Sequence, residues 1–142
     1  HYRVINVFCE NSQGEILVLR KSKSCKRFAG MYDFSVGGHV RSGETYEEAA
    51  CREIYEEIGL RVASESLIEV AYLRFPNRLN TSSFSKLFYV PIGEYSPILS
   101  DENDSYFYYD KDQLKSELHI KPFKSDYEEL FHLFYLWRIE NE

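Results

Sequence analysis

The stretch from Gly38 to Leu60, GHVRSGETYEEAACREIYEEIGL, constrains the fold of this chain more than any other part. Its second half predicts a helix from Thr45 to Ile58, because apolar residues recur there at helical spacing. Thr45 itself, or Ser42 upstream, can cap the first turn, and Gly59 can end the last turn in a left-handed conformation. The sequence therefore predicts a helix with well-defined ends.

The predicted helix has an apolar face and an acidic face. Ala50, Ile54 and Ile58 form a stripe that predicts packing against a sheet. The adjoining face carries three glutamates at positions i, i+3 and i+4, within a sector of roughly 100°. They are Glu53, Glu56 and Glu57. Acidic residues on a helix usually form a solvated face, but like charges at this spacing repel each other, which favours a cation between them.

The charge of the chain supports the same interpretation. The net charge is -6 at pH 7 and the pI is about 5.3, so the sequence has no basic surface for a nucleic acid. An anionic substrate would need a cation, and carboxylate oxygens are typical ligands of Mg²⁺ or Mn²⁺. We therefore expect Mg²⁺ or Mn²⁺ as cofactor.

The cysteines and the apolar segments bear on the compartment. Cys9, Cys25 and Cys51 are odd in number and form no CxxC pair, which favours a reducing environment. No run of apolar residues approaches the length of a membrane span. We expect a cytoplasmic protein that contacts no membrane, and the sequence is compatible with a monomer or a homodimer.

Two features beside the acidic face predict a site. Arg52 precedes the first glutamate and can orient a carboxylate with its guanidinium group, Glu44 being one candidate. Gly37 and Gly38 let the backbone come close to the site, where a main-chain carbonyl could be a further metal ligand.

The rest of the chain reads as one domain over residues 1–142, with strands before and after the helix. A strand from Tyr32 to Val36 is expected to end at Gly37 and Gly38. The other expected strands are Arg3–Cys9 and Ile16–Leu19, which look like a hairpin, then Leu67–Phe75, Phe84–Pro91 and Tyr106–Tyr109. The other expected helices are Asp112–Leu118 and Ser125–Ile139.

The stretch Gly38–Leu60 resembles the Nudix box, G-x5-E-x7-R-E-U-x-E-E-x-G-U with U aliphatic, at every position. The order of strands and helices is also similar to that family. The resemblance implies an α+β fold, an α/β/α sandwich in which helices flank a mixed sheet. It also implies a metal-dependent pyrophosphohydrolase that cleaves the P–O–P linkage of a small nucleoside diphosphate derivative.

The resemblance assigns roles to individual residues. Glu53, Glu56, Glu57 and the carbonyl of Gly37 match the metal ligands, while Arg52, Glu44, Gly38 and Gly59 match positions that support the site. The base that activates water varies in position within the family. Glu53 is one candidate and Glu102 is another, with Asp101 and Asp104 behind it; an ordinary solvated acidic turn is the other interpretation of that loop.

Two other functions stay open. The segment Tyr32–Val40 resembles the branch that includes isopentenyl-diphosphate isomerase, which suggests isomerisation. Such isomerases place a catalytic cysteine just ahead of the box, but residues 28–40 contain none, and Cys25 and Cys51 are out of register. The hydrolase relatives are therefore favoured. A non-catalytic domain that binds a nucleotide is the second rival, although binding alone does not require the full set of glutamates.

Substrate contacts are expected in loops around the box. These loops are Arg20–Tyr32, Asn77–Ser83 and Ser96–Ser105. The segment Arg20–Arg27 is rich in arginine and lysine, which indicates either a solvated loop or an edge that contacts phosphate.

Overall fold

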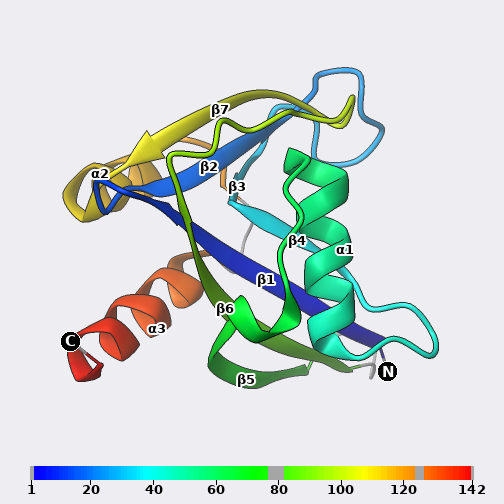
Figure 1. The fold of residues 1–142 in the computed structure, drawn as a ribbon. Coiled ribbons are helices and arrows are strands. Elements are labelled where there is room, and N and C mark those ends of the chain that lie inside the picture. The colour runs from blue at the N-terminus through cyan, green and yellow to red at the C-terminus, as the bar shows by residue number, and fades with distance from the viewer. Residues whose placement is uncertain (1, 77–81, 124–126, 142) are drawn as a thin grey trace.

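A seven-stranded mixed sheet with helices on both faces forms the core of this computed structural model, which describes residues 2–76, 82–123 and 127–141 (Figure 1). The strands are β1 (Tyr2–Asn11), β2 (Ile16–Lys21), β3 (Tyr32–Phe34), β4 (Val36–His39), β5 (Ile68–Pro76), β6 (Ser82–Gly93) and β7 (Asn103–Tyr109). The helices are α1 (Tyr46–Ile58), α2 (Lys111–Ile120) and α3 (Tyr127–Glu140), with a short 3₁₀ turn, η1 (Ser64–Ser66). The strand order is β3-β2-β1-β6-β5, with β4 also paired to β1 and β7 to β2. The predicted α+β sandwich is confirmed.

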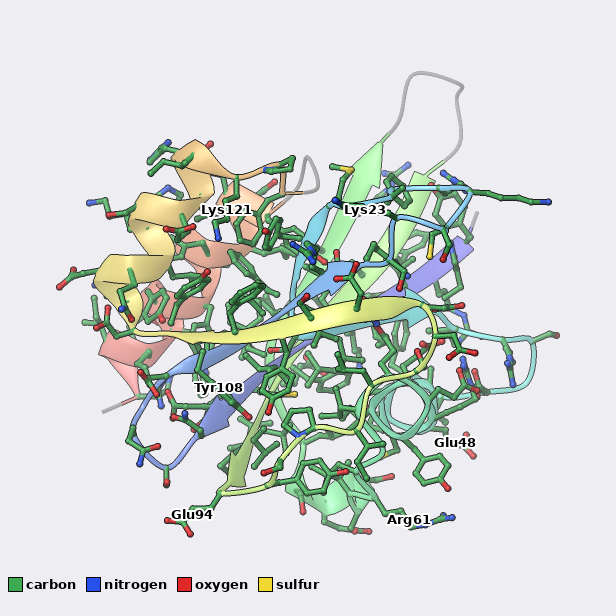
Figure 2. All side chains as sticks on the ribbon, turned by 90° about the horizontal axis from the view of Figure 1, so that it is seen from above. Lys23, Glu48, Arg61, Glu94, Tyr108 and Lys121 are labelled. Atoms are coloured by element: carbon green, nitrogen blue, oxygen red, sulfur yellow. The ribbon has the colours of Figure 1, made fainter. Side chains whose placement is uncertain are left out.

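Alternate side chains of the central strands face two separate cores, because successive side chains of a strand point to opposite faces. On β1, Val7 packs in the core under α1, and Phe8 packs in the core under α3. The predicted helix stripe of Ala50, Ile54 and Ile58 is buried in the first core. Figure 2 shows α1 nearly end-on at one side of the sheet, with α2 and α3 at the other side.

The ends of α1 follow the local sequence. Thr45 is the N-cap, and its side chain accepts the Glu48 backbone N–H at 3.0 Å while the Glu48 carboxylate accepts the Thr45 N–H at 2.9 Å. Gly59 ends the helix with φ 77°, a conformation that glycine adopts without strain. The predicted helix is therefore confirmed at both ends, with Thr45 rather than Ser42 as the cap.

The expected single strand Tyr32–Val36 is wrong, because it is two strands separated at Ser35. Ser35 has φ 49° and is fully buried, and its hydroxyl accepts the Cys9 N–H at 2.9 Å and donates to the Leu17 carbonyl at 2.7 Å. This kink moves the chain from β3, which pairs with β2, to β4, which pairs with β1.

The expectation that Gly37 and Gly38 break the strand is also wrong. Both lie inside β4, where Gly37 is opposite Asn6 and Gly38 is opposite Ile5 of β1. The glycines are needed because Asn6 and Glu53 pack closely on them, and not because the chain turns there.

The remaining elements agree with the sequence apart from their ends. β1 and β2 form a hairpin with Glu10 opposite Ile16. β7 begins at Asn103 rather than Tyr106 because it pairs with β2 along its length. Residues 125 and 126 of the predicted last helix, and residues 77–81 of one predicted loop, lie outside the described residues.

The last helix is connected to the sheet by a partly buried ion pair. Arg138 of α3 donates two hydrogen bonds to the carboxylate of Glu10, which also accepts the hydroxyl hydrogen bond of Tyr89 at 2.7 Å. Within the described ranges, no helix combines the length and the apolar character that crossing a membrane requires.

Candidate active site

A cleft of about 610 Å³ opens beside α1 and β4. Arg52 and Glu53 of α1 line one side of it, and the loop after β2 lines another. Glu102, the residue just before β7, also reaches this cleft. Residues far apart in the sequence therefore meet in one cavity with charged side chains on its walls, of the size that holds small ligands.

Arg52 links three carboxylates beside the cleft. Its Nε and Nη2 donate to the two oxygens of Glu44 at 2.8 and 3.0 Å. Its Nη1 donates to Glu53 at 2.7 Å and to Glu56 at 3.3 Å, and its Nη2 also donates to the His39 carbonyl at 2.9 Å. The contact that the sequence indicated between Arg52 and Glu44 is present, and the same guanidinium fixes Glu53.

The hydrogen bonds from Arg52 lower the pKa of Glu44 from 4.5 to about 2, with a further contribution from the Arg41 N–H at 2.8 Å. Arg3 holds the same loop, because its guanidinium donates to the Glu44 and Arg41 carbonyls at 3.1 and 3.2 Å. Glu44 is therefore a permanent anion that keeps Arg52 in place.

The three glutamates of α1 do not converge on one point, which corrects the expectation of a ready-made cluster. Glu53 lines the cleft, Glu56 is half-exposed and lies 3.6 Å from Arg41, and Glu57 is buried. In residues 2–76, 82–123 and 127–141, no group of three or more His, Cys, Asp and Glu side chains is arranged to hold a metal. Glu53 and Glu56 share the guanidinium of Arg52, whereas Glu57 turns inward to the Gly37 N–H.

The surroundings of Glu57 oppose a negative charge on its buried carboxyl group. Its carboxylate is 5% exposed and accepts one backbone hydrogen bond, from Gly37 at 3.3 Å. Burial raises the pKa of Glu57 well above its usual value, and the negative charges of Glu53 and Asp33 raise it further, while Lys21 and the Gly37 N–H oppose this shift. In the absence of a cation, this environment therefore favours the protonated form of Glu57.

Asp33 is a part of this site that the sequence analysis missed, and so is the electrostatic effect of Lys21, a residue of the basic segment, on Glu57. Asp33 is buried on β3 and accepts the Tyr127 hydroxyl hydrogen bond at 2.7 Å. Burial opposes the charge of Lys21, but Glu57, Glu102 and Asp33 together raise its pKa. A carboxylate inside the apolar segment Tyr32–Val36 was the signal for Asp33, because such a residue is rarely buried without a partner.

Gly38 is required by the position of Glu53. A Cβ atom at residue 38 would lie 2.5 Å from the Cδ atom of Glu53 and 2.6 Å from its Oε1. At Gly37 a Cβ would lie 3.0 Å from Oδ1 of Asn6, another residue that lines the cleft. The two glycines thus let α1 approach β4 closely enough for the Glu53 carboxylate to pack on the strand.

Of the three acidic candidates around the start of β7, Asp101, Glu102 and Asp104, only Glu102 lines the cleft. It is exposed, and its carboxylate lies 3.5 Å from Nζ of Lys21. Asp104 pairs instead with Arg20 at 2.8 Å, and the Asp101 carbonyl accepts the Ser22 hydroxyl hydrogen bond at 2.8 Å. Glu102 is therefore the best placed of the three for chemistry.

The basic segment after β2 lies at the cleft. Lys21, Lys26 and Arg27 line it, together with Cys25 and Phe28. This arrangement agrees with the sequence interpretation of an edge that faces the ligand. The Cys25 thiol donates to the Glu102 carbonyl at 3.4 Å, whereas Cys9 is fully buried and its burial raises the pKa of the thiol to about 12.

A family model for the NUDIX domain matches residues 1–134. The chain belongs to the Nudix family. It is 33% identical to a Nudix hydrolase of Nostoc sp. over 137 residues, which are 95% of this chain and 80% of the relative. The crystal structure of a protein of Deinococcus radiodurans, DR0079, superposes with a TM-score of 0.79 and 33% identity, covering 93% of this chain and 82% of that one.

The chain is also similar to an isopentenyl-diphosphate Delta-isomerase of Pectobacterium atrosepticum, at 26% identity over 122 residues, 85% of this chain and 68% of the isomerase. The Nudix hydrolase relatives and the domain match over residues 1–134 identify a hydrolase that acts on pyrophosphate bonds.

Nudix enzymes generally use divalent metals such as Mg²⁺ or Mn²⁺, and the residues of this Nudix box fit such an ion. The buried carboxyl group of Glu57 accepts the Gly37 N–H, its ionisation is opposed by burial and by Glu53 and Asp33, and the Glu53 carboxylate rests in the space that Gly38 leaves. Both provide hard oxygen donors of the type that Mg²⁺ prefers. A cation would relieve the repulsion that raises the pKa of Glu57.

Proposed function

We propose that this Nudix domain hydrolyses the P–O–P linkage of a nucleoside diphosphate derivative with Mg²⁺ or Mn²⁺. Glu53, Glu56, Glu57 and the Gly37 carbonyl would hold the metal, with the three side chains turning toward the ion when it binds. The observation that carries the proposal is the position of Glu53, fixed by Arg52 at 2.7 Å, in a cleft that is basic on another side.

The residues around the cleft have different roles. Arg52 orients Glu53 and is itself oriented by Glu44, which is ionised at neutral pH because its pKa is about 2. Lys21, Lys26 and Arg27 provide positive charge for the phosphates. A bound divalent ion would polarise the phosphoryl oxygens and acidify a water molecule.

The proton of the attacking water needs an acceptor in the same cleft. Glu102 and Glu53 are the two candidates that line it. Glu53 is held against Gly38 by the hydrogen bond from Arg52, whereas Glu102 reaches the cleft from a separate element and is exposed, with Lys21 3.5 Å away. We therefore assign the base to Glu102 and the metal to Glu53.

The test is a hydrolysis screen over nucleoside diphosphates, nucleoside triphosphates, ADP-ribose, NADH and dinucleoside polyphosphates with Mg²⁺ or Mn²⁺, in which the products are separated by anion-exchange chromatography, because cleavage of several of these compounds yields nucleotides and phosphomonoesters rather than free phosphate. The wild type should cleave at least one compound, and Glu56→Gln or Glu57→Gln should lower turnover by orders of magnitude. Glu94→Gln is the control, because Glu94 is exposed on the loop after β6 and does not line the cleft. Full activity of the Glu57→Gln protein would refute the metal assignment. Tight nucleotide binding without turnover at any metal concentration would favour a non-catalytic domain.

The two base candidates differ in what their substitution does to metal binding. Glu102→Gln should reduce kcat while the concentration of Mn²⁺ that gives half-maximal activity stays the same. Glu53→Gln should raise that concentration as well. If Glu102→Gln leaves kcat unchanged, the base is not in this loop.

Isomerisation of a diphosphate ester is the second candidate, because Cys25 lines the cleft and the chain is 26% identical to an isopentenyl-diphosphate isomerase. Product analysis separates the two reactions, since an isomerase gives a rearranged diphosphate and releases no phosphate. Cys25→Ser should leave hydrolysis intact. Loss of activity in that variant, together with a rearranged product of the wild type, would support the isomerase.

A further inference from the structure

Packing in the hydrophobic cores explains neither the backbone conformation of Phe28 nor the exposure of its side chain. Its φ is 60°, in the left-handed region where a residue with a Cβ is strained. Its side chain is 42% exposed, and it belongs to neither of the two hydrophobic cores. Strained residues of this kind gather at ligand-binding sites, where the surrounding structure holds them in place.

The loop that carries Phe28 is closed tightly at its base. The Met31 N–H donates to the Phe28 carbonyl at 2.9 Å, the Gly30 N–H to the Lys21 carbonyl at 3.0 Å, and the Lys21 N–H to the Met31 carbonyl at 2.8 Å. These bonds connect Phe28 to the end of β2. The ring therefore has a defined place on the wall of the cleft.

Phe28 differs in chemistry from the charged side chains around it. The guanidinium carbon of Arg27 lies 4.9 Å from the centre of the ring. Lys21, Lys26 and Arg27 suit the phosphates of a ligand, and Glu53 suits a metal bound to them, but none of these provides an apolar flat surface. Flat bases stack on such rings, and the guanidinium of an arginine beside the ring strengthens the platform.

We propose that Phe28 is the surface on which the base of the substrate stacks, so that this cleft selects nucleoside diphosphate derivatives over diphosphates that lack a base. This inference rests on the proposed function, because it places the base of the same substrate whose P–O–P linkage is cleaved. Phe28 contacts the part of the substrate that does not react and is therefore a specificity-determining residue.

Tyr55 is a matched control for an exposed ring under an arginine. Its side chain is 46% exposed, and the guanidinium carbon of Arg61 lies 4.2 Å from the ring centre. Tyr55 lies in the ordinary helical backbone of α1 and does not line the cleft. A change at Tyr55 tests what the loss of an exposed aromatic ring does without loss of a ligand contact.

The experiment measures binding by calorimetry with Mg²⁺ present. The probes are the α,β-methylene diphosphates of adenosine, guanosine, uridine and cytidine, in which a P–C–P bridge prevents cleavage. The base-free counterpart, ribose 5-(α,β-methylene)diphosphate, measures the contribution of the sugar and the phosphates alone. The variants are Phe28→Leu, Phe28→Trp, Phe28→Gly and Tyr55→Leu.

At least one base-bearing probe should bind the wild type about tenfold or more tightly than the base-free probe, as expected for one stacked base. Phe28→Leu should remove most of this advantage, because leucine is apolar but cannot stack, and Phe28→Trp should keep it. Tyr55→Leu should leave both affinities unchanged. Phe28→Gly should lose the advantage without a lower melting temperature, because glycine relieves the strain at φ 60°.

Three results would overturn the inference: no base-bearing probe that binds the wild type better than the base-free probe, an advantage that survives in Phe28→Leu and Phe28→Gly, or an equal loss of affinity for both kinds of probe. The Phe28→Gly protein keeps the test decisive if Phe28→Leu does not fold. Hydrolysis by the wild type and by Glu57→Gln, measured in the same preparations, separates failure of this inference from failure of the proposed function.

Discussion

Arg52 and Glu44 form a two-pronged ion pair, with Nε 2.8 Å from Oε2 and Nη2 3.0 Å from Oε1. The same guanidinium reaches Glu53 at 2.7 Å. Because a planar guanidinium can hold both carboxylates at once, the loop before α1 controls the orientation of a side chain in the cleft. The first two predictions depend on this pair.

Arg52→Lys should reduce kcat by about 10- to 100-fold with little change in KM, because an ammonium group cannot hold Glu44 and Glu53 in the same geometry. The rate of hydrolysis under saturating metal measures both constants. Arg61→Lys is the control, since Arg61 lies over Tyr55 outside the cleft. Unchanged kcat in Arg52→Lys would show that the orientation of Glu53 does not matter for turnover.

Glu44 should contribute to stability in a pH-dependent way. Arg52 lowers the pKa of Glu44 from 4.5 to about 2, so the folded state favours the ionised form. The contribution is fully present above pH 4.5 and is lost as the pH falls toward 2. Urea unfolding of the wild type and Glu44→Gln should therefore differ at pH 7, and the difference should shrink between pH 4.5 and 2. A difference that is constant over this range would contradict the ion-pair origin.

Glu57→Gln should stabilise the metal-free protein while it removes activity. Burial and the charges of Glu53 and Asp33 raise the pKa of Glu57, so the folded state binds a proton more tightly than the unfolded state does. The protein therefore loses stability as the pH rises above the unfolded value of 4.5. In EDTA at pH 8, Glu57→Gln should melt about 2–4 °C higher for each kcal/mol gained. The two proteins should melt alike near pH 4, and a lower melting temperature of the variant at pH 8 would contradict this electrostatic account.

Addition of Mn²⁺ or Mg²⁺ should raise the melting temperature of the wild type, because an ion that binds only the folded state stabilises it by mass action. The rise should be larger at pH 8 than at pH 5, since protons compete with the metal at Glu57. Glu57→Gln should show a smaller rise at both pH values. Differential scanning fluorimetry against metal concentration measures the effect, and an equal rise in the variant would remove Glu57 from the set of ligands.

Gly38→Ala should reduce turnover by at least about tenfold, because the new Cβ would overlap the Glu53 carboxylate at 2.5 Å and displace it. Glu53 can rotate away, so the loss of stability should be modest. Gly14→Ala has the opposite pattern: φ is 78° and nothing lies within 4 Å, so stability should fall by about 1 kcal/mol and turnover should remain. Urea unfolding and kcat distinguish the two variants, and full activity of Gly38→Ala would contradict the packing argument.

Local chemistry made the helix predictable, whereas long-range contacts decided the details of the site. The cap at Thr45 and the stop at Gly59 depend on neighbours in the sequence, so both were predicted. The kink at Ser35 depends on hydrogen bonds to Cys9 and Leu17, which no local pattern reveals.

The same distinction between local and long-range contacts explains why the directions of the three glutamate side chains were not predicted. The spacing of Glu53, Glu56 and Glu57 placed them on one sector of α1, but spacing does not determine where each side chain points. Glu56 turns toward Arg41 and Arg52, and Glu57 turns inward toward Gly37. The counter-charge of Lys21 comes from another strand and was likewise outside the reach of the sequence pattern.

The parallel pairing of β1 with β6 determines when the cleft can form during synthesis. Tyr2 is opposite Ser83 and Asn11 is opposite Gly93, so the central pair of the sheet joins two segments that leave the ribosome far apart in time. Non-local pairings of this kind form slowly, because a long loop must close first. A nascent chain that ends soon after Leu60 already carries the whole metal-binding motif but lacks the strand that orders its scaffold. We expect such a chain to depend on chaperones and to be easily degraded until β6 has emerged.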